Sequence, residues 1–235
     1  MEFFIAFQTA FALLLSGDAA VAEIITLSMQ VSIISTIAAL CLGLPLGALL
    51  ATCHFTGRQA IITLLNTMLS MPPVVIGLLV YLMISRAGPF GFLELLYTAP
   101  AMMIAQFILV FPISAALSRQ IFESLDSEYS PLFGTLHTPL RRRVMVLIYD
   151  ARLSLITVGL ACFGRAISEV GAVIIVGGNI AHVTRVMTTA IALETSRGEL
   201  SRALALGIVL MLIALLVNSL SSWLRIRMEK AGAHV

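Results

Sequence analysis

The sequence predicts an all-α, polytopic membrane protein with about five transmembrane helices. Of its 235 residues, 60% are hydrophobic and only 11% are charged, whereas soluble domains carry about a quarter charged residues. Mean hydropathy is correspondingly high, at +1.05. The apolar residues also form long stretches, each sufficient for a helix that crosses the roughly 30 Å hydrocarbon core of a bilayer. Since lipid offers the backbone no hydrogen-bond partners, helices are the form that such stretches take.

Five stretches meet this length requirement, and they lie near residues 25–52, 60–85, 97–118, 148–177 and 200–223. The opening segment 3–15 is shorter and stops at Gly17-Asp18. It favours a helix lying in the membrane interface, with a sixth span as the alternative. We therefore predict an amphipathic, periplasmic N-terminal segment (1–22), one transmembrane domain (23–224) and a cytoplasmic tail (225–235).

Basic residues are divided unevenly between the two sets of loops, and Lys and Arg are retained on the cytoplasmic side of short loops. The richer set consists of Arg58, Arg119, Arg141, Arg142, Arg143, Arg152, Arg225, Arg227 and Lys230, and the poorer set of Arg86, Arg185, Arg197 and Arg202. This division puts the N-terminus outside and the C-terminus in the cytoplasm. It predicts a multi-pass protein of the cytoplasmic (inner) membrane.

The composition also argues against several functions. A net charge of +2 provides no basic surface for nucleic acid. The cysteines are isolated and lack the spacing of a zinc or redox site, so we expect no metal and no bound cofactor. The chain has neither the G-x-x-x-x-G-K-[ST] loop that binds ATP nor a G-x-S-x-G nucleophile motif, and we expect no catalytic residues.

The longest polar segment is a predicted cytoplasmic loop at about residues 119–149. Loops of this length in compact proteins are usually functional. Within it, Ser130-Pro131 is typical of a helix start, with serine as the N-cap and proline at the first helical position. We expect a short helix from this point to Gly134.

Two of the predicted spans contain residues that interrupt an apolar helix. Pro72 and Pro73 remove helical hydrogen bonds from the second span and predict a kink, which is either a gate or a fixed packing irregularity. Arg165 and Glu169 lie four residues apart in the fourth span, so they share one helix face and can neutralise each other. This pair is either a structural ion pair or part of a translocation pathway. Nearby glycines favour close helix approach or local unwinding.

The polar loop contains Glu128 and Gly134 six residues apart, and an apolar segment follows at 144–146. In this spacing it resembles the coupling motif of the permeases of ATP-binding-cassette (ABC) importers, which closes with such an apolar segment. Tyr129 and Ser130 replace two alanines of the family pattern, and Leu147 stands where a proline is expected. The resemblance implies that four residues couple the chain to a partner ATPase: Glu128, Tyr129, Ser130 and Gly134.

The segment 163–194, which includes Val176-Gly-Gly-Asn-Ile180, resembles the tungstate-type permeases of this family. Molybdate and sulfate permeases are similar more loosely. Further similarity at 43–47, 69–77 and 101–106 extends the resemblance over most of the chain. It implies the type I ABC importer permease fold and inward transport of tungstate, with molybdate as the alternative cargo, by alternating access.

The resemblance also implies partners: a cytoplasmic ATPase dimer that uses the ATP, an extracytoplasmic oxyanion-binding protein, a second copy of this chain and membrane lipid. The pathway or gate would involve Arg165, Glu169, Pro72 and Pro73. Hydrogen-bond donors of an external segment would contact the oxyanion or the binding protein, namely Asn179, Thr184, Arg185 and Thr188. The alternatives are an ion-coupled secondary transporter that uses Glu169 and an intramembrane enzyme.

Overall fold

The computed structural model describes residues 7–8, 12 and 17–232, and between 17 and 232 every regular element is a helix. In chain order these are α2 (Ala19–Thr52), α3 (Arg58–Ser70), α4 (Pro73–Ile84), η1 (Gly91–Leu93), α5 (Ala99–Thr135), α6 (Leu140–Ile167), α7 (Gly171–Gly177), α8 (Met187–Arg197) and α9 (Leu200–Gly232). Within this range, four helices are long and apolar enough to cross a bilayer, and the bent pair α3–α4 makes a fifth. The predicted all-α fold and the count of about five spans are confirmed. The interfacial helix predicted for residues 3–15 lies almost entirely outside the described residues.

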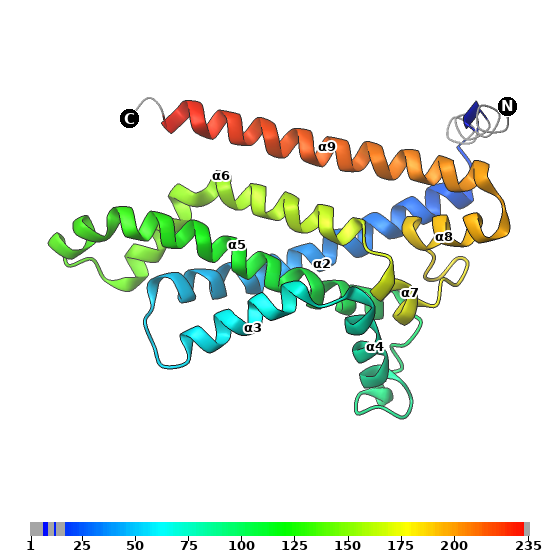
Figure 1. Ribbon diagram of the computed structural model, residues 1–235, viewed down its shortest axis with the longest axis horizontal. Coiled ribbons are helices and arrows are strands. Elements are labelled where there is room, and N and C mark those ends of the chain that lie inside the picture. The colour runs from blue at the N-terminus through cyan, green and yellow to red at the C-terminus, as the bar shows by residue number, and fades with distance from the viewer. Residues whose placement is uncertain (1–6, 9–11, 13–16, 233–235) are drawn as a thin grey trace.

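The elements form an elongated bundle in which α2, α3, α5, α6 and α9 run along the long axis (Figure 1). One end of the bundle carries the turn between α5 and α6, and we call it the hairpin end. The other end carries α4, α7, α8 and the irregular segments beside them, and we call it the loop end. The chain enters α2 at the loop end and leaves α9 at the hairpin end (Figure 1).

The centre of the bundle is the close contact between α2 and α5. A Cβ atom built on Gly43 would collide with the side chain of Ser114, 2.7 Å from its Cβ, and one on Gly47 would collide with the hydroxyl of Ser118. Small residues four positions apart on both helices therefore let the two backbones approach, as is common in membrane bundles. The Ser118 hydroxyl bonds to the carbonyl of Ser114 in its own helix.

The second predicted span is broken rather than kinked. Met71 and Pro72 are each followed by proline, which drives them out of the helical region, and their ψ angles are 132° and 130°. Pro73 then begins α4, where its missing N–H costs nothing. Because two consecutive residues are extended, α4 leaves the axis of α3 at 105°.

The polar segment 119–149 is largely helical, which corrects the expected loop. The apolar α5 continues as a helix to Thr135 and α6 begins at Leu140, so a turn of only four residues separates them. Ser130 is therefore an interior helical residue and not an N-cap. Phe133 explains this outcome, because it is 7% exposed and packs with Phe122 and Leu147. This packing holds the last turns of α5 in place against the local cap signal.

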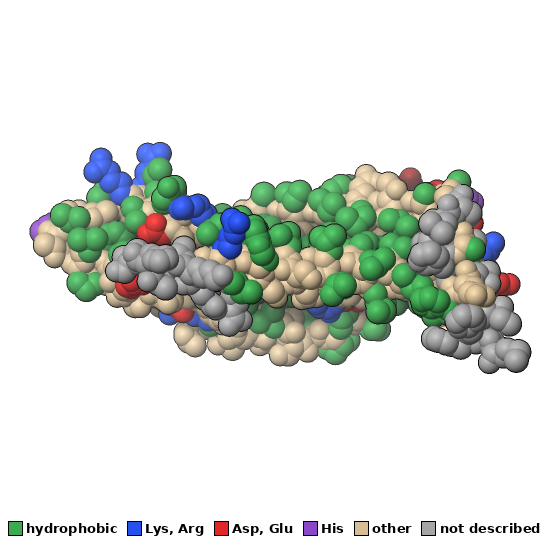
Figure 2. Space-filling view, turned by 90° about the horizontal axis from the view of Figure 1, so that it is seen from above, with side chains coloured by type: hydrophobic (Ala, Val, Ile, Leu, Met, Phe, Trp, Pro, Cys, Tyr) green, Lys and Arg blue, Asp and Glu red, His purple; other side chains and the backbone are tan. Residues whose placement is uncertain are grey.

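The fourth predicted span is also two helices. The first, α6, ends at Ile167, and α7 starts at Gly171 after a break of three residues. The predicted tail 225–235 belongs to α9 as far as Gly232. In the space-filling view, hydrophobic side chains cover the middle of the molecule, and most visible Lys and Arg side chains lie toward the hairpin end (Figure 2).

Candidate functional site

The hairpin of α5 and α6 is fixed by a partly buried ion pair. Arg143 donates to both carboxylate oxygens of Asp126, which is 8% exposed. The guanidinium of Arg143 also lies 5.4 Å from the ring centroid of Phe133. Two-point pairing between a planar guanidinium and a carboxylate fixes orientation as well as distance. The hairpin can therefore move as one rigid piece.

The tip of the hairpin presents an open surface. Glu128, Ser130 and Gly134 are exposed, and a Cβ built on Gly134 would meet no atom within 4 Å. Large apolar side chains are exposed around them, with Leu136 and Tyr149 both at 66%. Exposed apolar groups beside polar ones are the usual composition of a docking surface. Predicted contact residues thus lie together here, and their role in binding an ATPase stays a prediction.

Tyr129, the fourth residue of the predicted coupling group, is half-buried and faces α6. Its hydroxyl is hydrogen-bonded to Asp150, and this contact raises the pKa of Tyr129. Its ring centroid lies 5.8 Å from that of Phe133. Tyr129 therefore contributes to the stiffness of the hairpin more than to its surface.

A second charged group links the hairpin to α3. Glu123 on α5 accepts from Arg58 at 2.5 Å and from Arg119 at 2.7 Å. Arg58, at the first turn of α3, also donates its Nε to the carbonyl oxygen of Leu50 at 2.6 Å. The end of α2, the start of α3 and the polar part of α5 are thus held by one network. Charge patterning alone did not reveal it, because Arg58 and Glu123 are 65 positions apart.

The two broken spans meet at the loop end. A Cβ on Gly77 of α4 would lie 2.7 Å from the Cα of Ala172 in α7, and one on Gly171 would lie 2.8 Å from Val74 Cγ2. The two short helices therefore cross with almost no side chain between them. Each helix directly follows a break, at Pro72 or at Glu169. Movement of one short helix must be passed to the other.

Arg165 and Glu169 form the predicted ion pair, with 2.6 Å between Nη1 and Oε2. Glu169 lies in the break after α6 and not on its regular face, which corrects the prediction of one shared helix face. Its other oxygen accepts from the backbone N–H of Ala172 at 3.2 Å, and its carbonyl accepts from Thr188 at 2.8 Å. The Glu169 side chain is 5% exposed, whereas that of Arg165 is 38% exposed. Glu169 thus ties three elements together, and the outer part of Arg165 remains accessible.

Gln106 of α5 also bonds to this break, through the carbonyl of Ala166 at 3.0 Å. This buried amide joins α5 to the last turn of α6, as expected for a polar residue between membrane helices. The break is therefore held from two sides, by Gln106 and by Thr188.

The predicted external donors differ in accessibility. Thr184 and Thr188 are buried, and their hydroxyls bond to the carbonyls of Gly177 and Glu169. Asn179 is half-buried and joins Arg185 to α8, because it accepts from Arg185 at 3.3 Å and donates to the carbonyl of Thr189. Asn179 and Arg185 are the members of this group placed for an external contact. That contact stays a prediction. Thr184 holds the turn after α7 together, and Thr188 ties α8 to the break after α6.

Tyr97 is a residue of the loop end that sequence reasoning missed. Its backbone N–H donates to Val176 at 3.0 Å, and its ring occupies the space that a Cβ on Gly178 would need. The Gly177-Gly178 pair indicates a close approach of another group, but the sequence does not show that this group is Tyr97, which lies about 80 positions earlier.

Among the described residues, no group of three His, Cys, Asp or Glu side chains could hold a metal ion.

The chain is similar to known proteins over most of its length. No family model matches the chain. The tungstate uptake system permease protein TupB of Peptoclostridium acidaminophilum is 40% identical over 213 residues, which is 91% of this chain and 93% of that protein. TupB of Campylobacter jejuni is 39% identical over 93% of this chain and 92% of its own length. A probable anion ABC transporter permease of Haloferax volcanii is 35% identical over 87% of this chain and 90% of its own.

Proposed function

Since this chain belongs to the family of ABC transporter permeases that includes the tungstate uptake permeases, we propose that it imports tungstate across the cytoplasmic membrane by alternating access. It is a multi-pass membrane protein and a transport subunit. The observation that supports an ATP-coupled role is the rigid hairpin with its open tip at Glu128 and Gly134. A permease that hydrolyses no ATP needs such an element for a partner to grip.

In this proposal an ATPase dimer binds the hairpin ends of two copies of the chain, and an extracytoplasmic oxyanion-binding protein docks at the loop ends. The basic residues near the hairpin end support a cytoplasmic location for that end and for the C-terminus. ATP binding closes the ATPases and moves each hairpin. The Glu123 network passes this motion to α3, and the contact between Gly77 and Ala172 passes it on to α7.

Arg165, Glu169, Pro72 and Pro73 are the proposed gate residues. Both breaks lie next to the crossing of α4 and α7, so a rigid-body shift of that crossing would open or close a path beside them. The accessible part of Arg165 supports contact with an anion in transit, because a guanidinium offers several donors to an oxyanion. No metal or other cofactor is part of the proposal.

The test uses the open tip of the hairpin. We expect Gly134→Trp to leave the isolated permease as stable as the parent protein, because Gly134 is exposed and a Cβ built there meets no atom of the same chain within 4 Å. It should abolish ATP-dependent tungstate uptake in vesicles and weaken co-purification of the ATPase. The matched control is Gly207→Trp, another helical glycine with open space around it. Normal uptake with Gly134→Trp would overturn the coupling role of the tip.

A further inference from the structure

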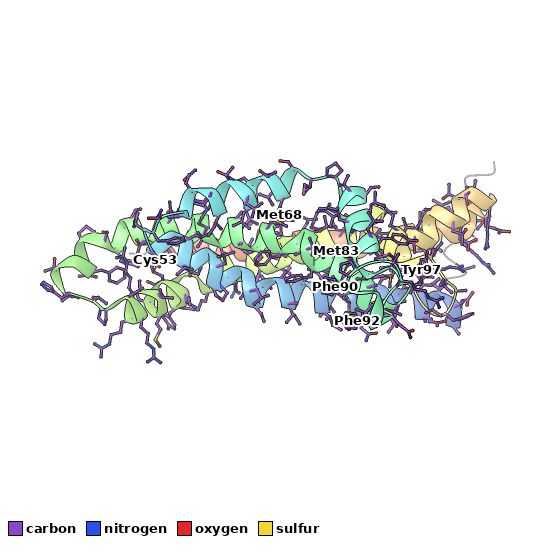
Figure 3. The ribbon with its side chains drawn as sticks, turned by 90° about the horizontal axis from the view of Figure 1, so that it is seen from below. Cys53, Met68, Met83, Phe90, Phe92 and Tyr97 are labelled. Atoms are coloured by element: carbon purple, nitrogen blue, oxygen red, sulfur yellow. The ribbon has the colours of Figure 1, made fainter. Side chains whose placement is uncertain are left out.

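A large cavity lined by polar and charged groups lies at the loop end, where the segment that connects α4 to α5 begins. Its volume is about 610 Å³, within the roughly 300–1,000 Å³ typical of sites for small ligands. Tyr81, Ser85, Arg86, Glu94 and Tyr97 supply its polar lining. Figure 3 labels Tyr97 in this part of the molecule, together with Phe90 and Phe92 of the same connecting segment.

Tyr97 is held in the wall of this cavity by the neighbouring turn. Its φ is 63°, an unusual value for a tyrosine, and its N–H is bonded to the carbonyl of Val176. The ring rests on Gly178, where a Cβ would lie 2.8 Å from Tyr97 Cδ1. Gly178 itself has φ +70°, so both its conformation and this contact require glycine. The Val-Gly-Gly-Asn-Ile segment thus fixes one wall of the cavity.

The cavity offers hydrogen-bond donors. Tyr81 and Tyr97 share a side-chain hydrogen bond, which raises the pKa of Tyr97. One hydroxyl proton is used in the shared bond, which leaves the other for a ligand. Arg86 is exposed and has no ion-pair partner within the described range 17–232. It contributes a positive charge and several further donors.

Arg86 is also better placed than Arg185, which lines a second cavity near this end. The Nε and Nη2 atoms of Arg185 are already engaged by Asn179. The cavity beside Arg185 measures only about 90 Å³. The larger cavity therefore has both the room and the unengaged cation.

We propose that the Arg86 cavity is an entry site for a tetrahedral oxyanion dianion, which accepts hydrogen bonds from Arg86 and from the free hydroxyl of the tyrosine pair. This inference rests on the proposed function and deepens it, since the loop end is the external face in that scheme. Glu94 in the same lining repels a dianion and keeps the site weak. Weak binding suits a path that must release its cargo, as it does in channels.

The test is a tungstate titration of the purified permease–ATPase complex in lipid nanodiscs, without the binding protein, followed by the shift in thermal unfolding. Arg86→Gln, and separately the double change Tyr81→Phe with Tyr97→Phe, should raise the half-saturating tungstate concentration by about tenfold, the usual effect of losing a charge-assisted hydrogen bond. The double change keeps an aromatic ring resting on Gly178, because only the hydroxyl groups are removed. Glu94→Gln should lower the half-saturating concentration. Phe92→Ala, in the same segment and 76% exposed, is the control and should leave it unchanged.

A second readout is the tungstate imported per ATP hydrolysed in vesicles that contain the binding protein as well. Arg86→Gln should lower this ratio while the loaded binding protein still stimulates ATP hydrolysis. Unchanged titrations in both altered proteins would overturn the entry site. An unchanged titration with weaker stimulation by the binding protein would overturn it too, and would assign the cavity to docking. Failure of the parent complex to take up any tungstate would instead refute the proposed function.

Discussion

The crossing of α4 and α7 is the most sensitive point of the structure, and Gly77→Ala tests it. The added Cβ would lie 2.7 Å from Ala172 Cα and 3.1 Å from the Ala172 carbonyl oxygen, whereas ordinary Cβ contacts begin at 3.4 Å. Both neighbouring atoms are backbone, so no side chain can rotate away. The helices must separate by several tenths of an ångström, and overpacking of this kind typically costs about 1–3 kcal/mol.

The assay is thermal unfolding of the purified permease in detergent, together with tungstate uptake in vesicles. At about 2–4 °C per kcal/mol for a chain of this size, Gly77→Ala should lower the midpoint by roughly 2–12 °C and reduce uptake. Adding Ala172→Gly should not rescue it, because the clash is with atoms that glycine keeps. Gly207→Ala is the control, since a Cβ there meets no atom within 4 Å. Parent-like stability, or rescue by Ala172→Gly, would refute the proposed contact.

Three further changes have defined outcomes. Gly43→Ala should destabilise the α2–α5 contact and lower the unfolding midpoint. Ser114→Gly should restore part of this loss in a double-mutant cycle, because the clashing Oγ and Cβ atoms belong to Ser114. Purely additive effects on the midpoint would contradict this contact. Glu123→Gln should leave ATP hydrolysis by the complex intact but lower the amount of tungstate imported per ATP hydrolysed, since it weakens the contacts with Arg58 and Arg119. An unchanged ratio of tungstate to ATP would show that α3 takes no part in coupling. Glu169→Ala should lower the unfolding midpoint more than Glu169→Gln does, because glutamine can still accept the hydrogen bond from the backbone N–H of Ala172. Equal effects of the two changes would argue against this contact.

Sequence patterning predicted the bundle but not its breaks. Hydropathy reveals where a chain can cross a bilayer, and five passes follow from it. Pro72-Pro73 indicated a disturbance, yet the 105° bend depends on two successive extended residues. The break after α6 depends on contacts with Gln106 and Thr188, which lie on other helices. Contacts between residues far apart in the sequence cannot be predicted from the local sequence around the break.

The candidate sites show the same limit. The Ser130-Pro131 signal is a correct local rule that burial of Phe133 overrides. Thr184 and Thr188 were selected as donors by residue type, but the structure uses both hydroxyls for backbone carbonyls. Arg165 and Glu169 form an ion pair, as their spacing of four positions predicts. The pair forms even though Glu169 lies just beyond the end of α6. Pairs close in sequence were predictable, whereas Arg58–Glu123 and Tyr97–Gly178 required the fold.

The central claim is that this chain moves tungstate with energy from a partner ATPase. The most direct measurement is accumulation of labelled tungstate in vesicles that hold the permease, the ATPase and the oxyanion-binding protein. We expect uptake that requires ATP and all three proteins, and that stops when Gly134→Trp replaces the parent chain. Uptake by the permease alone, driven by an ion gradient without the ATPase, would contradict the account and favour a secondary transporter.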